Sequence, residues 1–173
     1  MFKFLAGIIF ALLMLPIFIL WYVKTGHLEV ATDAKELPFE HQLAHMALDA
    51  KTDKEAPKDP PFQASKDDLL SGGQLYREHC AVCHGLPNEP KTFIAQGMFP
   101  DPPQLFKGKG VTDDPAGVTY WKVANGIRLT GMPAFKKTLK EKEIWQISEL
   151  MAGADKLPSE VMTLLTKPLP TQP

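Results

Sequence analysis

The feature that most constrains this chain is the pentapeptide Cys80-Ala81-Val82-Cys83-His84. Two thiols stand three positions apart, and an imidazole directly follows the second. If these residues form about one helical turn, both cysteines can meet the two vinyl groups on one edge of a haem. The histidine then lies under the ring with a nitrogen directed at the iron. This spacing is the attachment signature of c-type haem, so the pattern predicts one covalently bound haem c.

Three other chemistries use a Cys-x-x-Cys pair, and the rest of the sequence disfavours each of them. Structural zinc usually needs a second pair of ligands at similar spacing, but the chain has only two cysteines. Its remaining histidines supply no such pair: His27, His41, His45 and His79. A redox dithiol would need a strand-helix-strand pattern around the motif, and a disulfide across two residues would close an unusually tight loop. Haem attachment is therefore the favoured interpretation.

A long apolar segment opens the chain. The run from Phe4 to Val23 contains no charge and is interrupted only by Gly7 and Pro16. At helical rise, its length matches the hydrocarbon thickness of a bilayer. Trp21 and Tyr22 stand at its far end, where aromatic residues of a membrane interface occur. The segment is therefore predicted to be a transmembrane helix.

The alternative to a membrane anchor is a cleaved secretory signal, whose apolar region is normally shorter and ends in a small-x-small site. Lys24-Thr25-Gly26 follows the run, and lysine is a poor residue three positions before a cleavage site. The sequence therefore favours an uncleaved, single-pass anchor over residues 1–24. Because c-type haem is attached outside the bacterial inner membrane, the haem domain is expected on the periplasmic face.

Residues 25–64 are predicted to be a charged, proline-rich linker that includes one possible short helix. Within it, apolar residues recur at the three- and four-residue steps of an amphipathic helix: Phe39, Leu43, Met46, Ala47 and Ala50. This segment could dock on a partner subunit or serve only as spacer. His41 and His45 share a helix face, but no third metal ligand stands near them in the sequence.

Residues 65–155 are predicted to form an all-α domain with three main helices. The first, capped by Asp67 or Asp68, runs into the Cys80 turn. It contains Gly72 and Gly73, which would lower helix stability unless another helix crosses closely there.

The second helix is predicted to open at Asp113-Asp114-Pro115 and to end at Asn125-Gly126. The third is predicted to begin at the capping box Thr138-x-x-Glu141. Residues 156–173 form a C-terminal extension, in which residues 158–166 could add a short helix and the tail from Lys167 is expected to be mobile.

Met132 is the predicted second ligand of the haem iron. It lies in Thr130-Gly131-Met132-Pro133, between the second and third helices. A thioether is a soft, neutral ligand that favours ferrous iron and raises the reduction potential. A methionine in a rigid Gly-x-Pro loop is held by the backbone, whereas a helical methionine is usually core filler. The main rival is Met98, in Gly97-Met98-Phe99-Pro100.

Five motifs in order along the chain resemble class I c-type cytochromes of the monohaem, membrane-anchored bacterial type. They are Gly72-x-x-Leu75-Tyr76, Cys80-x-x-Cys83-His84-Gly85, Asn125-Gly126-Ile127, Gly131-Met132-Pro133-Ala134-Phe135 and Ile144-Trp145. The resemblance covers about residues 65–155 and implies the class I cytochrome c fold, with three main helices around one haem. It also implies that the Gly72 helix crosses the Trp145 helix. A proline carbonyl after the motif, from Pro87 or Pro90, is expected to accept the His84 Nδ1 hydrogen.

These parts predict an electron carrier and not an enzyme. Because His84 and Met132 would fill both axial positions, the iron has no open site for a substrate, and the expected chemistry is one-electron exchange at the haem edge. The expected partners are redox proteins, with the chain either a subunit of a membrane complex or a shuttle to one. A quinol-oxidising complex, a terminal oxidase and a photosynthetic reaction centre are all compatible.

Two other functions remain open at this point. The chain could be the haem-bearing subunit of a dehydrogenase or reductase whose catalytic site is on another chain. It could also be a haem-based ligand sensor, which would need a displaceable distal ligand. Nucleic acid is disfavoured as a partner, because the chain carries 19 basic and 20 acidic residues and no strong basic excess.

Overall fold

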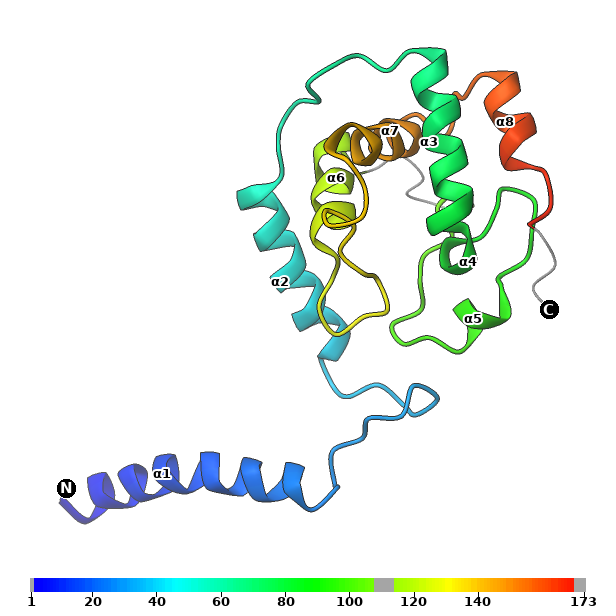
Figure 1. Ribbon diagram of the computed structural model, residues 1–173. Helices are drawn as coiled ribbons and strands as arrows, with labels where there is room; N and C mark the ends of the chain where they lie inside the picture. The colour runs from blue at the N-terminus through cyan, green and yellow to red at the C-terminus, as the bar shows by residue number, and fades with distance from the viewer. Residues whose placement is uncertain (1, 108–113, 170–173) are drawn as a thin grey trace. The chain divides into compact units, whose positions relative to one another are not determined.

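The computed structural model describes residues 2–107 and 114–169, and in this part of the chain every regular element is a helix (Figure 1). The helices are α1 (Phe2–Lys24), α2 (Glu40–Glu55), α3 (Lys66–His79), α4 (Ala81–His84), α5 (Phe93–Gln96), α6 (Ala116–Asn125), α7 (Glu141–Ala152) and α8 (Ser159–Leu165). The all-α prediction is confirmed. The chain divides into two compact units, Met1–Pro38 and Phe39–Pro173.

The first unit contains α1, which includes the whole predicted span. The helix is 23 residues long, contains Pro16 and buries none of its side chains. Its length and apolar composition are sufficient to cross a bilayer. The same properties would suit a secretory signal near an N-terminus.

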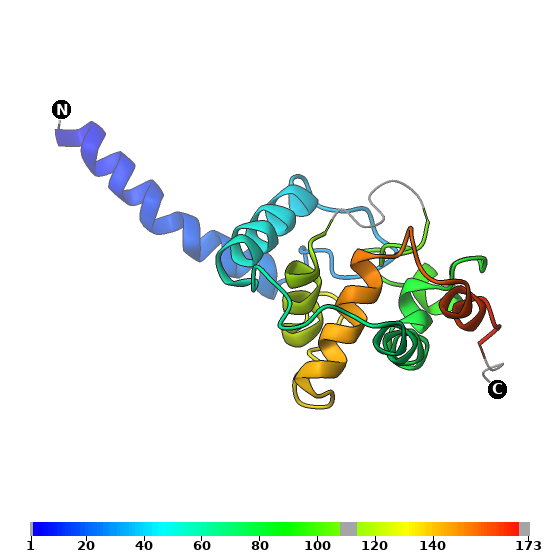
Figure 2. The ribbon, with the colours of Figure 1, turned by 90° about the horizontal axis from the view of Figure 1, so that it is seen from above.

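The second unit is organised around the crossing of α3 and α7. A Cβ on Gly72 would overlap the backbone carbonyl of Gln146 in α7, so only glycine allows the two helices this approach. The neighbouring Gly73 points to α8 instead, where a Cβ would lie 3.2 Å from Leu164 Cδ2. Figure 2 shows α3 end-on, with α7 on one side and α8 on the other. The crossing implied by the resemblance is confirmed, and each of two adjacent glycines serves a different helix.

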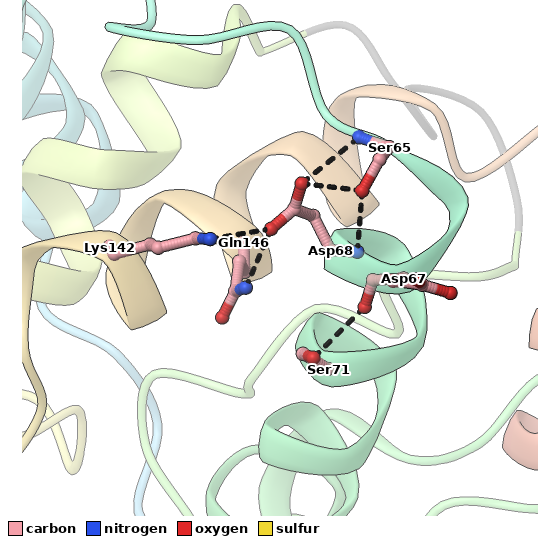
Figure 3. A network of polar contacts seen from close by, with 6 residues as sticks. All are labelled: Ser65, Asp67, Asp68, Ser71, Lys142 and Gln146. Atoms are coloured by element: carbon pink, nitrogen blue, oxygen red, sulfur yellow. Dashed lines mark hydrogen bonds and ion pairs between the residues drawn. The ribbon is translucent and has the colours of Figure 1, made fainter.

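A polar network at the start of α3 holds the same crossing (Figure 3). Ser65 is the N-cap: its hydroxyl accepts from the Asp68 N–H at 3.2 Å, while Asp68 Oδ2 accepts from the Ser65 N–H at 3.1 Å. Asp68 Oδ1 accepts from Gln146 Nε2 at 2.9 Å and lies 3.1 Å from Lys142 Nζ, and both partners belong to α7. The sequence predicted Asp67 or Asp68 as the cap. Instead Ser65 is the cap, and Asp68 completes the capping box.

α6 packs against α7 and leads into the loop that carries Met132. It begins at Ala116, with Pro115 as its N-cap; Asp113, part of the predicted start, lies outside the described residues. The rings of Tyr120 and Trp145 are stacked between the two helices, with centroids 4.3 Å apart. Trp145 is thereby buried in the contact between α6 and α7.

The start of α7 differs from the prediction. Its N-cap is Lys140, whose backbone N–H donates to the Glu143 carboxylate at 2.6 Å. Thr138 was predicted to cap this helix, but its hydroxyl donates to the Phe135 carbonyl at 3.1 Å. The predicted capping box is therefore wrong, because the turn at Phe135 already uses the threonine hydroxyl.

The C-terminal extension forms part of the core. Val161 and Leu165 of α8 are fully buried. The Arg77 guanidinium donates hydrogen bonds to the carbonyls of residues 167 and 168, and Leu169 packs against the same apolar cluster as α8. The expectation of a mobile tail from Lys167 is therefore wrong as far as Leu169; Pro170 lies outside the described residues.

Residues 39–57, here called the strap, pack against α6. Within α2 the side chain of Thr52 is buried, and Trp121 Nε1 of α6 donates to Glu55 Oε2 at 3.2 Å. Beyond the helix, the Pro57 carbonyl approaches so closely that a Cβ on Gly117 would overlap it. The helix predicted from residue 39 to residue 50 is therefore present, continues to Glu55 and is attached to the domain that follows.

Candidate haem site

α4 is a single helical turn that presents the pentapeptide. The chain passes from α3 into α4 at Cys80, whose N–H donates to the Tyr76 carbonyl at 2.8 Å and whose carbonyl accepts from the His84 N–H at 2.9 Å. The Tyr76 hydroxyl donates to the Gly85 carbonyl at 2.7 Å. Since Tyr76 is fully buried, this bond ties the end of the turn to the core. The cysteines therefore have the helical spacing that attachment requires.

A backbone carbonyl orients the His84 imidazole. His84 Nδ1 lies 2.9 Å from the Pro103 oxygen, and a carbonyl can only accept. Nδ1 therefore carries the hydrogen, and Nε2 keeps a lone pair for a metal. Burial lowers the pKa of His84, although the bond to Pro103 opposes this shift, so the neutral form that can bind iron is favoured. Histidine ligands of metals are commonly fixed in this way.

The resemblance implied Pro87 or Pro90 as this acceptor, and both are wrong. The acceptor belongs to Pro103, 19 residues after the histidine. Between them the chain forms α5, whose N-cap Thr92 donates its hydroxyl to the Val82 carbonyl at 2.5 Å. This contact holds the segment between residues 85 and 103 against α4, and the end of the segment, Pro103, lies beside the imidazole.

The two thiols differ from those of a redox-active pair. Burial, with a smaller contribution from the neighbouring Cys83, raises the pKa of Cys80 to about 12. Burial also raises the pKa of Cys83. Reactive thiols of redox pairs usually have lowered pKa values instead, so a redox dithiol is disfavoured. The described residues also contain no cluster of three or more His, Cys, Asp or Glu side chains suited to a metal ion.

Met132 lies on a loop closed by short-range hydrogen bonds. The Ile127 N–H donates to the Met132 carbonyl at 3.2 Å. The Thr130 hydroxyl donates to the Ile127 carbonyl at 2.7 Å and accepts from the Met132 N–H at 3.1 Å. The loop returns to α6 where the Phe135 N–H donates to the Val123 carbonyl at 3.0 Å. The backbone is therefore fixed on both sides of the methionine.

Met98, the rival ligand, packs beside the same loop. A Cβ on Gly131 would overlap the Met98 methyl group and lie 3.7 Å from the Met98 sulfur. Met98 therefore contacts the loop that carries Met132 from a different part of the chain. The Met98 side chain is half-buried and covers the backbone next to Met132.

Two apolar clusters supply half-buried side chains around these groups. Cys80 and Leu105 pack against a cluster that includes the buried Tyr76 and Leu86. Leu75, Met132 and Phe135 pack against a second cluster, on α6 and α7. Cys80 and Met132 thus belong to separate clusters. The side chains that pack against the two clusters are only partly buried, so apolar surface remains available to a planar apolar ligand.

A buried donor beside the imidazole also fits such a ligand. Gln104 directly follows Pro103, and a Cβ on Gly85 would overlap its Oε1 atom. Its Nε2 group is buried without a hydrogen-bond partner in the described part of the protein. Buried donors rarely remain unpaired, so this group is available to an acceptor on a bound molecule. The residues present therefore fit haem.

Comparison with known proteins agrees with this geometry. Residues 67–151, just under half of the chain, match the family model described as cytochrome C oxidase, cbb3-type, subunit III. The chain is a monohaem c-type cytochrome. The cytochrome is also similar to the quinohemoprotein alcohol dehydrogenase ADH IIB of Pseudomonas putida, with 29% identity over 89 residues. That alignment covers 50% of the cytochrome but 11% of the dehydrogenase, so the similarity concerns a small part of that enzyme.

The comparisons confirm the predicted cofactor and the coarse function. A c-type cytochrome domain binds haem c covalently and transfers electrons. The matched range includes the pentapeptide, the Met98 segment and the Met132 loop. It begins after the strap and ends before α8.

Proposed function

We propose that this cytochrome carries single electrons at the outer face of a bacterial inner membrane, to which α1 anchors it. Haem c supplies the one-electron couple when bound. Cys80 and Cys83 would hold it through thioether bonds, and His84 Nε2 and Met132 Sδ would bind its iron. The observation that supports this assignment most directly is the His84–Pro103 hydrogen bond, because it leaves Nε2 free to bind iron.

The protein's own groups support a carrier over a catalyst. If His84 and Met132 both bind the iron, the protein would leave no position on it for a substrate. The Thr130 and Ile127 hydrogen bonds hold the Met132 backbone, which would keep its sulfur in position for the iron. A neutral imidazole and a thioether favour the ferrous form and a raised potential. Catalysis, where it occurs, belongs to a partner chain.

The partner we propose is a membrane oxidoreductase, with a terminal oxidase as the first choice. The support is the family model, whose description names an oxidase subunit. A quinol-oxidising complex and a reaction centre are the other two possibilities. The similarity to a small part of a quinohemoprotein dehydrogenase favours, as a second candidate, a haem-bearing subunit of a dehydrogenase.

Replacement of each methionine tests the ligand assignment. Met132→Ala should abolish the near-infrared charge-transfer band between sulfur and ferric iron and lower the reduction potential, because a soft ligand is lost. The matched control, Met98→Ala, should keep the band at neutral pH and room temperature. The reverse result, with the band lost in Met98→Ala and kept in Met132→Ala, would show that Met98 is the ligand. Carbon monoxide binding to the reduced, unsubstituted protein at neutral pH would favour a sensor over a carrier.

A further inference from the structure

α2 presents side chains on two opposite faces, and only one face is used within the domain. The inner face holds the buried Thr52 and the Glu55 carboxylate bonded to α6. Leu43 and Met46 lie on the other face and are 62% and 66% exposed, and Phe39, directly before the helix, is 71% exposed. Leu43 and Met46 are three residues apart and share a helix face. Together with Phe39, the N-cap residue directly before the helix, they are here called the α2 stripe.

The α2 stripe cannot turn inward while the strap is attached. The Glu55–Trp121 hydrogen bond and the contact between Pro57 and Gly117 fix the rotation of the helix. Phe39 precedes the first turn in a left-handed conformation, with φ of 65°, which residues other than glycine rarely adopt. An exposed aromatic ring on a strained backbone is unfavourable in water alone, so the face is suited to an apolar environment outside the domain.

The chain length before α2 limits where this environment can be. α1 ends at Lys24 and α2 begins at Glu40. At most about 3.6 Å per residue, the intervening segment can span no more than roughly 55 Å. If α1 crosses a bilayer, the α2 stripe is therefore confined to the neighbourhood of that bilayer. The attached strap confines the haem domain to the same region.

We propose that the α2 stripe inserts into the interfacial layer of the bilayer that α1 spans, with the haem domain on the water side of the strap. This inference rests on the proposed anchor. Phe, Leu and Met are residues that interfacial helices bury between headgroups and acyl chains. A stable protein interface usually takes about 20 to 30 residues a side, more than three side chains offer, whereas a bilayer requires no matching shape.

The charges of α2 define the kind of lipid contact. The helix contains four acidic residues and two lysines, as its sequence EHQLAHMALDAKTDKE shows. It therefore has no basic excess to attract anionic headgroups. The contact is apolar and weak by itself, and it becomes populated because the anchor keeps the helix at high effective concentration beside the membrane.

Spin labels on the full-length, haem-loaded cytochrome in phosphatidylcholine vesicles test this proposal. Cys80 and Cys83 are used by haem, so a single introduced cysteine is the one available thiol. Leu43→Cys reports on the α2 stripe, Leu13→Cys on α1, and Thr163→Cys on the exposed side of α8. In the reduced, low-spin protein, collisions with oxygen identify a label in lipid, and collisions with a water-soluble nickel chelate identify a label in water.

The proposal expects the labels at positions 13 and 43 to collide preferentially with oxygen and the label at 163 with nickel. Lipid exposure at 13 with water exposure at 43 would overturn stripe insertion but leave the anchor intact. Water exposure at both positions would overturn the anchor and the insertion together. A label at 43 that is water-exposed in vesicles and becomes protected only in native membranes would assign the α2 stripe to a protein partner instead.

A charge placed on the α2 stripe provides the matched comparison. Met46→Glu should move the label at position 43 from lipid to water, because a carboxylate resists burial among acyl chains. His45→Glu introduces the same group on the same helix, away from the α2 stripe, and should leave the label in lipid. An equal effect of both substitutions would indicate a general charge effect and would overturn the role of the stripe.

Discussion

Two glycines bring backbone segments into the same close contact, but with different support around them. Gly72 lets α3 cross the Gln146 carbonyl of α7, and Gly117 lets the strap place its Pro57 carbonyl against α6. Around the first contact, α7 buries Ile147 and Leu150 almost completely. Around the second, Thr52 is the buried residue of α2. Glycine permits the approach in both places, whereas the apolar area around it decides whether the contact belongs to the core.

The largest effect is expected at the α3–α7 crossing. Gly72→Ala forces a methyl group into the Gln146 carbonyl, which cannot move without displacing α7, and should lower the free energy of unfolding by about 1–3 kcal/mol. Gly73→Ala is the control, because it gains the same helix propensity but meets the ends of side chains and no backbone, with Leu164 Cδ2 nearest. Denaturant unfolding of the haem-loaded proteins measures both. Equal losses would mean that the crossing is no tighter than the contact with α8.

The polar network beside the same crossing should give a smaller, pH-dependent effect. The Ser65 hydroxyl, followed by Gln146 and Lys142, lowers the pKa of Asp68 well below its usual value. A lowered folded-state pKa adds stability above the unfolded pKa of about 3.9, and this stability is lost as pH falls below it. In unfolding titrations from pH 7 to 3, Asp68→Asn should therefore lose less stability than the unsubstituted protein. Asp67→Asn removes a neighbouring charge but none of these bonds, and should keep the original acid dependence.

The strap contact should be easier to break without unfolding the domain. Gly117→Ala would collide with the Pro57 carbonyl and release residues 39–57, while the global free energy of unfolding changes by less than about 1 kcal/mol. Amide hydrogen exchange within α2 should become faster, with α3 and α7 unchanged. Gly153→Ala is the control, because its Cβ would lie 3.5 Å from the Glu149 carbonyl oxygen, an ordinary van der Waals contact. This variant should leave amide exchange in α2 unchanged. Cooperative loss of the whole domain in Gly117→Ala would show that the strap is part of the core.

The smallest effect is expected at a third glycine, Gly131, which meets a flexible side chain. The end of Met98 covers this residue, so Met98→Ala leaves a gap beside the Met132 loop. The sulfur-to-iron band should then disappear at a lower temperature on heating than in the unsubstituted protein. Met98→Leu nearly keeps the volume and should restore the original temperature. A leucine variant as labile as the alanine variant would point to the sulfur atom and not to packing.

The sequence was most informative where function and local structure depend on adjacent residues. The pentapeptide needs only one helical turn to present its cysteines and histidine. A glycine inside a helix, such as Gly72, indicates a close helix crossing even when the position of the second helix in the sequence is unknown. Helix boundaries were less accurate, because the sequence offers several capping residues and tertiary contacts choose among them. Ser65 and not Asp67 is the N-cap, because the Asp68 carboxylate can accept a hydrogen bond from the Ser65 N–H and another from Gln146 of α7.

Long-range contacts could not be read from spacing. Pro87 and Pro90 are closer to the motif than Pro103, but proximity along the chain does not decide which carbonyl returns to the imidazole. The apolar pattern of α2 correctly predicted a helix, but its apolar residues Leu43 and Met46 lie on the exposed face and not on the face that packs against the domain. The inner face depends on Thr52 and Glu55, which do not stand out in an apolar pattern.

The distance along the chain between His84 and Pro103 also separates two tasks. The turn of α4 presents the imidazole through contacts between neighbouring residues, whereas the Pro103 carbonyl comes from the far end of a 19-residue separation. Without that carbonyl, either imidazole nitrogen can hold the proton, and the turn presents no unique ligand atom. The identity of the iron-binding nitrogen is therefore set by the segment that follows the motif and not by the motif itself.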